Sequence, residues 1–341
     1  MDKPNIPNQK NQYRKLSNRL VKYVSLIRQI YDTLNLEAAK MAVSVNYDGK
    51  GEFRFKDYPG LNDRLKKLLS RFVSDISGVV YSGTSQEWKE SNLIQDLVAD
   101  KVLKAYGANV NGKKYKIYYQ TNSNALKAFQ DRKDRGMNLS QKIWNQSENY
   151  KTELEYALSS AIEKGISAVT LSKRVSKYLK DFKSLQKDYK SKYGKAVDCN
   201  DCEYRSIRLA RSEINMAYRT AEQKRWEQMD FVVGYEIKLS HAHHHRMPHG
   251  DICDELVGKY PKDFKWMGWH PNDMCYVVPI LKTEDEFWDE DDDLKSKNEV
   301  EDTPKQFKDW VKDNQDKIQQ STRRGTAPYF LRDNPKYVGV N

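Results

Sequence analysis

Residues 240–279 read SHAHHHRMPHGDICDELVGKYPKDFKWMGWHPNDMCYVVP, and this stretch concentrates the unusual chemistry of the chain. All six histidines of the chain lie within it, together with two of the four cysteines. Histidine and cysteine are side chains that bind metals and carry out proton or thiol chemistry. So dense a group indicates that the segment uses them, and that the rest of the chain is a helical scaffold leading to it.

Zinc binding is the first candidate role for this segment. Zinc takes thiolate sulfur and imidazole nitrogen, usually as four ligands in a tetrahedron. The spacing H-x3-C-x16-H-x4-C gives one such set, with turn-forming glycines between its two halves. Its members are His249, Cys253, His270 and Cys275.

Two further groups leave alternatives open. Cys199 and Cys202 form a C-x2-C pair that either completes the zinc site, competes with it, or supplies two free thiols ahead of a helix. The run His243-His244-His245 is either a metal-binding or catalytic cluster or a solvated loop, because three consecutive side chains cannot all face the same way.

The composition is that of a surface-rich helical protein. Of 341 residues, 38% are hydrophobic and 31% are charged, which limits the size of the core. No apolar run approaches the ~18 residues that a membrane-spanning helix needs, and the first residues lack the apolar segment of a signal peptide. We therefore expect no membrane partner and a cytoplasmic chain, in which four cysteines favour metal binding over disulfides.

Charge is unevenly distributed. The whole chain carries a formal +11, whereas residues 281–341 hold 11 Lys and Arg against 15 Asp and Glu, a balance of −4, which leaves +15 on residues 1–280. A basic body favours a polyanionic neighbour such as nucleic acid. The candidate contact residues are Lys113, Lys114, Lys116, Arg205, Arg208 and Arg211. An ordinary amphipathic edge strand explains the three lysines and their interleaved tyrosines at least as well.

Hydrophobic spacing predicts helices over most of the chain. A long one is expected to be capped by Ser140 and stopped at Gly165, and another covers roughly two dozen residues after Cys202. The other predicted helices cover 9–43, 62–77, 85–106, 124–136 and 167–179. Strands are predicted between the turns at 48–49 and 59–60, at 113–120 and at 231–237.

The last sixty residues differ in character from the body. Residues 284–293 hold eight acidic residues in ten, which predicts an extended linker, while Phe287 and Trp288 keep open a docking motif for a basic partner surface. A helix is predicted over 303–319, clamping onto the body or another subunit.

Four motifs follow one another in a fixed order: EKGISAVTLSKRVSKYL, ARSEINMAYRTAEQKRW, DICDELVGKYP and HPNDMCYVVPI. In this order they resemble the Mu F-like minor head proteins of tailed phages, the head-morphogenesis family. The resemblance covers about residues 139–280. NLSQKIW and PYFLRDN are similar to versions in phages or prophages of gut Bacteroidetes.

The resemblance implies a structural metal site, and zinc is its expected ion. This chain departs from the family pattern in two places. The family often has C-x2-C where this chain has Gly250 to Cys253, and H-P-x-C-x-C where this chain has Asp273 before Cys275. Two thiolates are therefore absent, and His249 with Asp251 or Asp273 would replace them, with His241 as a further substitute.

The resemblance also implies a minor capsid protein, present in few copies at the portal vertex, that assists head assembly and DNA packaging or delivery and is not an enzyme. Its expected partners are the portal protein, major capsid or scaffold proteins and packaged double-stranded DNA. Its expected location is the virion, after assembly in the host cytoplasm.

We therefore expect a mostly α protein with a small α+β C-terminal domain, built as an elongated helical arm plus a Cys/His knuckle. The expected domains are a helical N-terminal region at 1–138, a Mu F-like domain with the knuckle at 139–281, an acidic linker at 282–302, and a C-terminal helix and anchor at 303–341.

Two enzymatic alternatives stay open. One is a metal-dependent nuclease that uses His244 or His245 as general base near Asp251. The other, ranked lower, is a toxin-like ADP-ribosyltransferase module resting on Arg211, Ser212 and Glu213.

Overall fold

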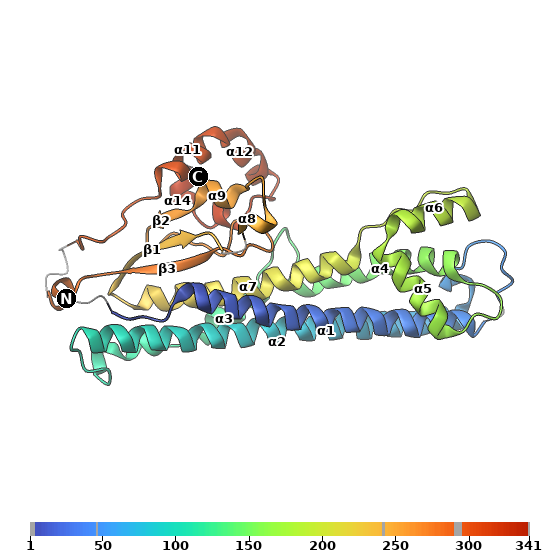
Figure 1. Cartoon of the computed structure of the whole chain (residues 1–341), viewed down its shortest axis with the longest axis horizontal. Helices are drawn as coiled ribbons and strands as arrows, with labels where there is room; N and C mark the ends of the chain where they lie inside the picture. Colours follow the sequence, from blue (N-terminus) through green and yellow to red (C-terminus); the bar gives the residue numbers. More distant parts are fainter. Residues whose placement is uncertain (1–3, 46, 241–242, 290–294, 340–341) are drawn as a thin grey trace. The chain divides into compact units, whose positions relative to one another are not determined.

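The computed structural model describes residues 4–45, 47–240, 243–289 and 295–339 (Figure 1). The chain is mostly helical, with a three-stranded antiparallel sheet toward its C-terminus. This confirms the expected fold class, mostly α with a small α+β part. None of the described helices combines the length and apolar character that crossing a bilayer requires.

The chain divides into two compact units, each assembled from stretches far apart in sequence. The sheet unit comprises Met1–Leu20, Gly83–Gln130 and Arg211–Asn341, and the helical unit comprises Val21–Ser82 and Asp131–Ala210. Three long helices supply residues to both units: α1 (Gln9–Val43), α2 (Pro59–Ala105) and α7 (Cys202–Gln228).

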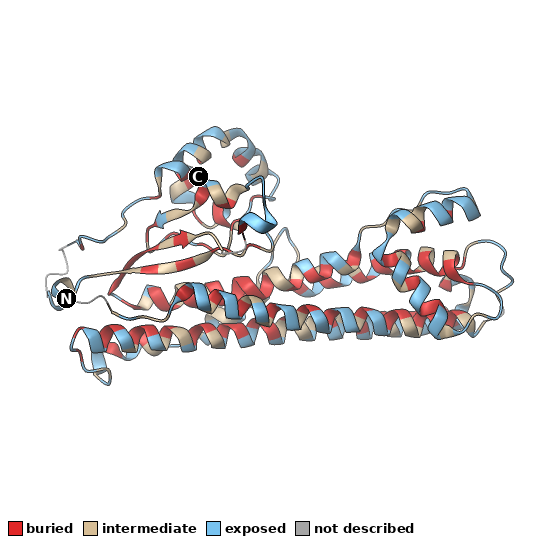
Figure 2. Cartoon of the chain, in the orientation of Figure 1, coloured by how far each residue is buried: buried red, intermediate tan, exposed pale blue. Residues whose placement is uncertain are grey.

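Helix α1 has the bounds that its apolar spacing predicted. Leu16, Leu20, Val24, Ile27 and Tyr31 recur at three- or four-residue intervals, and all are buried. Figure 2 shows the resulting alternation of buried and exposed residues along the helix. The stripe explains why this segment is helical, since burial of one face supplies most of a helix's stability in a protein.

Helix α2 is a single helix of 47 residues, so the prediction of two helices at 62–77 and 85–106 was wrong. Gly78 and Gly83 lie at the expected break, but each costs only about 1 kcal/mol in a helix interior. The buried stripe continues across them through Ile76, Val80 and Trp88. Packing therefore outweighs the local cost of the glycines.

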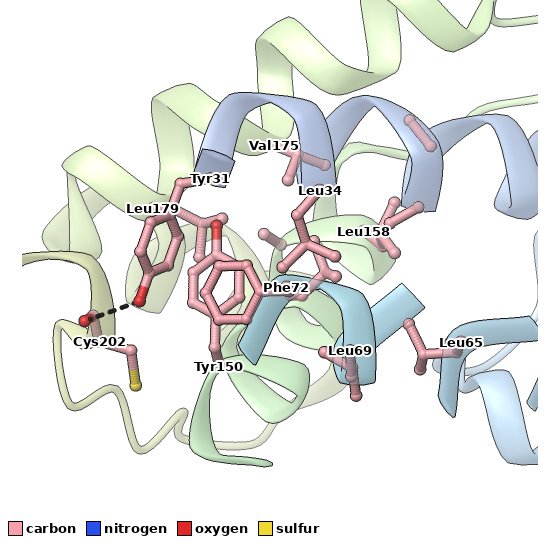
Figure 3. Packing of buried hydrophobic residues seen from close by; sticks show 14 of the residues in the cluster. Tyr31, Leu34, Leu65, Leu69, Phe72, Tyr150, Leu158, Val175, Leu179 and Cys202 are labelled. Carbon is pink, nitrogen blue, oxygen red and sulfur yellow. Dashed lines mark hydrogen bonds between the residues drawn. The ribbon is translucent and has the colours of Figure 1, made fainter. Parts of the chain in front are cut away.

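The core of the helical unit is built where α1, α2, α4 (Leu139–Ala161), α5 (Ala168–Lys180) and α7 contribute apolar side chains. Tyr31 lies edge-on to Phe72 and Tyr150, with ring centroids 4.9 and 4.6 Å apart (Figure 3). The Tyr31 hydroxyl donates to the Cys202 carbonyl at 3.1 Å. The first residue of α7 is thus fixed to this aromatic cluster.

Capping residues set the ends of α4 and α5. Asn138 is the N-cap of α4, and its side chain forms a reciprocal capping box with Gln141. The prediction that Ser140 caps this helix was therefore wrong by two residues. Ser167 caps α5, in agreement with the predicted range 167–179. Helix α6 (Phe182–Tyr193) follows, and its sequence pattern was missed.

Two predicted strands are short 3-10 helices instead. The turn-flanked segment near residue 55 forms η1 (Phe55–Asp57), with the Phe53 and Phe55 rings buried. The KKYKIYYQ segment forms η2 (Lys113–Tyr119), in which Tyr115 and Tyr118 are buried three residues apart. A three-residue spacing of buried rings suits a 3-10 helix and not a strand, whose side chains alternate. The helix expected at 124–136 is shorter, α3 (Ser123–Asp131).

The sheet has the order β2-β1-β3. The central strand β1 (Val232–Lys238) fulfils the prediction for 231–237 and pairs antiparallel with β2 (Gly258–Tyr260) and β3 (Tyr276–Leu281). A side chain at Gly234 would meet the Tyr260 carbonyl at 3.0 Å, so this strand position requires glycine. The segments that join the three strands carry all six histidines and two of the four cysteines, Cys253 and Cys275.

The C-terminal part covers this sheet unit with short helices. The acidic segment begins as α10 (Glu284–Trp288), where Phe287 packs on Tyr106 and Tyr115, so its described part is not an extended linker; residues 290–294 lie outside the described ranges. The single helix expected at 303–319 is two helices, α11 (Lys305–Asp313) and α12 (Gln315–Arg323), separated at Asn314. Two one-turn helices close the chain: α13 (Tyr329–Arg332) and α14 (Pro335–Val338).

Candidate metal centre

Cys253 is positioned by a capped single-turn helix. After β1 come α8 (His243–Arg246) and α9 (Ile252–Leu256). Asp251 is the N-cap of α9: its Oδ1 accepts from the Cys253 amide at 2.8 Å, and its own amide donates to Asp254 Oδ2 at 2.8 Å. This capping box fixes the direction in which the Cys253 side chain leaves the backbone, and that side chain is buried.

The His-Pro loop before β3 is organised by Asp273. The Asp273 carboxylate accepts from the amides of Trp269 and Cys275, both at 2.6 Å. Asn272 adopts a left-handed conformation, with φ 64°, which closes the turn. The loop thereby holds His270 and Cys275 on either side of a buried carboxylate whose oxygens are occupied by backbone donors.

These two segments bring four donor groups together. Cys253 Sγ lies 3.2 Å from His270 Nε2, and the same nitrogen lies 3.2 Å from Asp251 Oδ2. The Cys253 and Cys275 thiols hydrogen-bond to each other. A thiol pair, an imidazole and a carboxylate thus face one another from two different loops.

His243 joins the cluster from the side of Asp251. Its Nε2 lies 2.8 Å from Asp254 Oδ2 and 3.5 Å from Asp251 Oδ1. Within the described residues, two groups of three donors lie within 4.8 Å of one another: His243, Asp251 and Cys253, and then Cys253, His270 and Asp273. Both contain Cys253, so one cation position near its sulfur would be within reach of both groups.

The pKa values of both thiols are raised in this arrangement. The hydrogen bond with Cys275, followed by burial, raises the pKa of Cys253 far above its usual range. For Cys275, the hydrogen bond from Cys253 lowers the pKa, but burial and the neighbouring Asp273 raise it by more. A cation bound here would supply the positive charge that two thiolates require, and its binding would release protons.

Burial around the cluster is close to complete. Cys253, Cys275 and Asp273 are each 1% exposed, whereas the His270 side chain is 34% exposed. The sulfur atoms therefore face the protein interior, and the imidazole forms the solvent side of the centre.

Arg219 of α7 stabilises the His-Pro loop through hydrogen bonds to its main chain. Its guanidinium donates to the carbonyls of Met267 at 3.0 Å, Asp273 at 3.1 Å and Cys275 at 2.6 Å. It also stacks on the Trp266 ring at 4.3 Å. Gly268 has a φ of 123°, which L side chains rarely adopt, and a Cβ there would also lie 2.5 Å from Arg219 Nη1.

Of the four predicted zinc ligands, the structure places Cys253 and His270 in one donor group. Cys275 interacts with Cys253 but belongs to neither donor group, and the proposed substitute Asp251 lies beside His270. His249 is exposed and belongs to neither donor group, so the structure does not bring it together with Cys253 and His270. Asp273 is in a donor group but is already held by backbone amides. His241 lies outside the described residues.

His243 is the residue that sequence reasoning did not select. The triple histidine run is neither wholly a cluster nor wholly a solvated loop, because His243 is buried on Asp254 while His244 and His245 are exposed. The sequence signal that could have selected His243 is the capping box of Asp251 and Asp254, which begins eight residues further on. Its second carboxylate, that of Asp254, needs a partner, and His243 is that partner. Cys199 and Cys202 belong to the core cluster of the helical unit and to neither donor group.

The predicted nucleic-acid contacts are placed on both units. Lys113, Lys114 and Lys116 are exposed on η2 in the sheet unit. Arg205 and Arg208 are exposed on the part of α7 in the helical unit, and Arg211 is half-buried on the part in the sheet unit. Their contact with DNA stays a prediction.

Fold and site define a class: a mostly helical protein whose small antiparallel sheet carries a buried Cys/His/Asp group able to hold a metal ion. Comparison with protein-family models, with curated proteins and with solved structures finds no match to this chain.

Proposed function

We propose that this chain is a minor capsid protein of the head-morphogenesis type from a tailed phage, and that its Cys/His/Asp group is a structural zinc centre. In this role the protein binds and assembles, and it has no catalytic turnover. The order of the four motifs between residues 163 and 280 supports the family, and the helical architecture agrees with it.

The donor chemistry supports zinc. Two thiolates, one imidazole and one carboxylate are all ligand types that zinc accepts, and four ligands close its usual tetrahedron. Cys253, Cys275, His270 and Asp251 would hold the ion. His243 and Asp254 would then orient Asp251 from behind, as hydrogen-bond partners commonly do for metal ligands. A bound zinc supplies a cross-link between the α9 segment and the His-Pro loop.

The observation that carries a structural role is the burial of both sulfur atoms. Cys253 and Cys275 are 1% exposed, and Arg219 braces the loop that holds Cys275. Catalytic zinc sites keep an open coordination position for water and substrate, whereas structural sites are closed by protein ligands. Such a closed centre would fix the geometry of the loops beside the small three-stranded sheet.

The partners follow from charge. The +15 on residues 1–280 would face packaged DNA, with the exposed lysines of η2 and the arginines of α7 as contacts. The portal protein and the major capsid or scaffold proteins are the proposed protein partners, and no membrane is involved.

The proposal is tested by producing the tagged chain during phage growth in its host and purifying DNA-filled particles. Quantitative mass spectrometry is expected to find the chain in few copies per particle, together with the portal protein. Particles that form normally and never contain the chain contradict the capsid assignment.

The nuclease alternative is tested separately on the purified full chain. Supercoiled plasmid incubated with Mg²⁺ or Mn²⁺ is expected to stay intact. Cleavage that disappears in a His244→Ala/His245→Ala variant would establish the enzyme instead. Cleavage unchanged in that variant indicates a contaminating nuclease.

A further inference from the structure

A second surface lies in the helical unit and has no part in the metal centre. Helices α1 and α5 enclose an open groove of about 660 Å³. Asp32 and Leu36 of α1 line one wall. The other wall is formed by α5 and its C-terminal end, through Val169, Ser172, Lys173, Ser176, Lys177, Lys180 and Asp181. The two helices are joined by a hydrogen bond from Asn35 Nδ2 to Oγ of the lining residue Ser176, at 3.2 Å. The groove is therefore a fixed feature of the packing of α1 on α5.

The apolar residues that line the groove are Leu36 and Val169, and Ser172 and Ser176 line it beside them. Leu36 is only partly covered, and Val169 is 55% exposed although it lies on a helix whose other large aliphatic residues are buried. The buried members of the same helix are Leu171, Val175 and Leu179. Val169 thus presents apolar surface that the helical unit itself does not cover.

The α5 side of the groove is basic, whereas Asp32 lies on the α1 side. Lys173, Lys177 and Lys180 follow one another at four- and three-residue spacing, so they form a line along the groove side of α5. In the structure none of these described lysines forms an ion pair, whereas Arg174 on the adjoining face bonds Glu163 at 2.8 Å. Asp181, at the end of the line, is committed to capping α6 through the Ser184 amide and hydroxyl.

Helix α6 shows that the spacing of lysines along a helix does not by itself place them at the groove. Lys183, Lys187 and Lys190 have the same four- and three-residue spacing and are equally exposed, but they do not line the groove. They provide a control with matched charge and geometry.

We propose that the α1–α5 groove is a docking site for an amphipathic helix of a partner protein, with apolar residues facing Leu36 and Val169 and acidic residues facing the three lysines. An elongated groove lined by apolar residues is the usual receptor for such a helix, and complementary charges at its edge select the partner and its direction. Duplex DNA fits less well, because a phosphate backbone gains nothing from apolar lining residues. This site does not depend on the proposed capsid function.

The experiment uses the full chain and three labelled probes in fluorescence anisotropy: a helical peptide with a leucine stripe flanked by glutamates, the same peptide with lysines in place of glutamates, and a short DNA duplex. The acidic peptide is expected to bind the wild type, and the lysine peptide at least about tenfold more weakly. Lys173→Glu/Lys177→Glu/Lys180→Glu is expected to weaken the acidic peptide by about tenfold or more, and Lys183→Glu/Lys187→Glu/Lys190→Glu by less than about twofold.

A further variant separates the apolar lining residues from the lysines. Val169→Ser removes apolar surface without changing charge and is expected to weaken the acidic peptide several-fold, with the helical content unchanged by circular dichroism. The proposal is overturned if the wild type does not bind the acidic peptide, if both lysine triples weaken it equally, or if the groove triple reduces binding of the DNA duplex and leaves the peptide unaffected.

Discussion

The guanidinium of Arg219 donates to the main-chain carbonyl of Cys275 at 2.6 Å, and this bond links helix α7 to the loop that carries a candidate metal ligand. Arg219 is fully buried and makes two more bonds to carbonyls of the same loop. A buried guanidinium that satisfies several carbonyls is destabilising to remove, because its partners cannot recover water. The loop geometry at Cys275 therefore depends on a residue some fifty positions earlier in the chain.

Arg219→Lys is predicted to destabilise the chain by about 2–4 kcal/mol and to weaken metal binding by about tenfold or more, since one ammonium cannot replace the planar fork. Arg225→Lys is the matched control. Arg225 is equally buried and bonds the Tyr118 carbonyl and the Asn92 side chain, away from the donors. The Arg225→Lys substitution is expected to lower the free energy of unfolding to a similar extent while leaving metal affinity unchanged. Urea denaturation and chelator competition measure the two effects, and equal losses of affinity in both variants would refute a specific role for Arg219.

His243→Ala is predicted to weaken metal binding by about 10–100-fold, because His243 holds Asp251 and Asp254 beside Cys253. His249→Ala, a change in the same segment at an exposed position, is predicted to have no effect. Competition with a chromophoric zinc chelator measures both variants. If His249→Ala weakens metal binding and His243→Ala does not, the result supports the ligand set expected from sequence spacing, which contains His249.

Glu222 makes part of the stability of the sheet unit depend on pH. It is buried, accepts from the Tyr13 hydroxyl at 2.6 Å and from Gln95 Nε2 at 3.3 Å, and burial raises its pKa to about 8. The unfolded carboxyl ionises near its ordinary value of about 4.3. Between these two values the folded chain keeps a proton that the unfolded chain has released, so this group's contribution to stability falls as pH rises and the loss is complete above about pH 8.

The free energy of unfolding of Glu222→Gln, relative to that of the wild type, is therefore predicted to be higher above pH 8 than near pH 5, by at least about 1 kcal/mol. Urea denaturation of both proteins at several pH values measures the difference. A difference that stays constant across this range would mean that Glu222 does not titrate in the window.

Asn138→Ala is predicted to cost about 1 kcal/mol, because the Asn138 side chain accepts from the Gln141 amide at the start of α4. Ser140→Ala, at an exposed position inside the helix, is predicted to be neutral or slightly stabilising. Thermal unfolding of the two variants distinguishes the cap found in the structure from the one expected from the sequence.

Sequence periodicity was sufficient where one buried face decides the structure. The bounds of α1 and the position of β1 follow from the spacing of their apolar residues. It failed where tertiary packing overrides local preference, as at Gly78 and Gly83 within α2, and where buried tyrosines convert a strand-like composition into the 3-10 helix η2. The expected boundaries at 138, 281 and 302 rest on local composition. Local composition does not reveal the two-unit organisation, because three long helices contribute residues to both units.

The candidate site was partly predictable for a related reason. Residue type and spacing selected Cys253, His270 and Cys275, because scarce thiols and imidazoles gather in one segment. The fourth position could not be chosen in this way. It depends on the direction in which the capping box turns the Asp251 side chain and on the burial of His243. Neither can be predicted from the spacing of residues along the chain.

Cys253, Cys275, His270 and Asp251 are proposed to hold one structural zinc ion. Native mass spectrometry of the full chain, purified under reducing conditions with zinc and then desalted, tests this proposal most directly beside Cys253→Ser. About one zinc per wild-type chain is expected and none in the variant, and thermal unfolding of the wild type is expected to shift to lower temperature after chelation. A wild-type chain that stays free of metal, or a Cys253→Ser chain that retains as much zinc, would contradict the proposal.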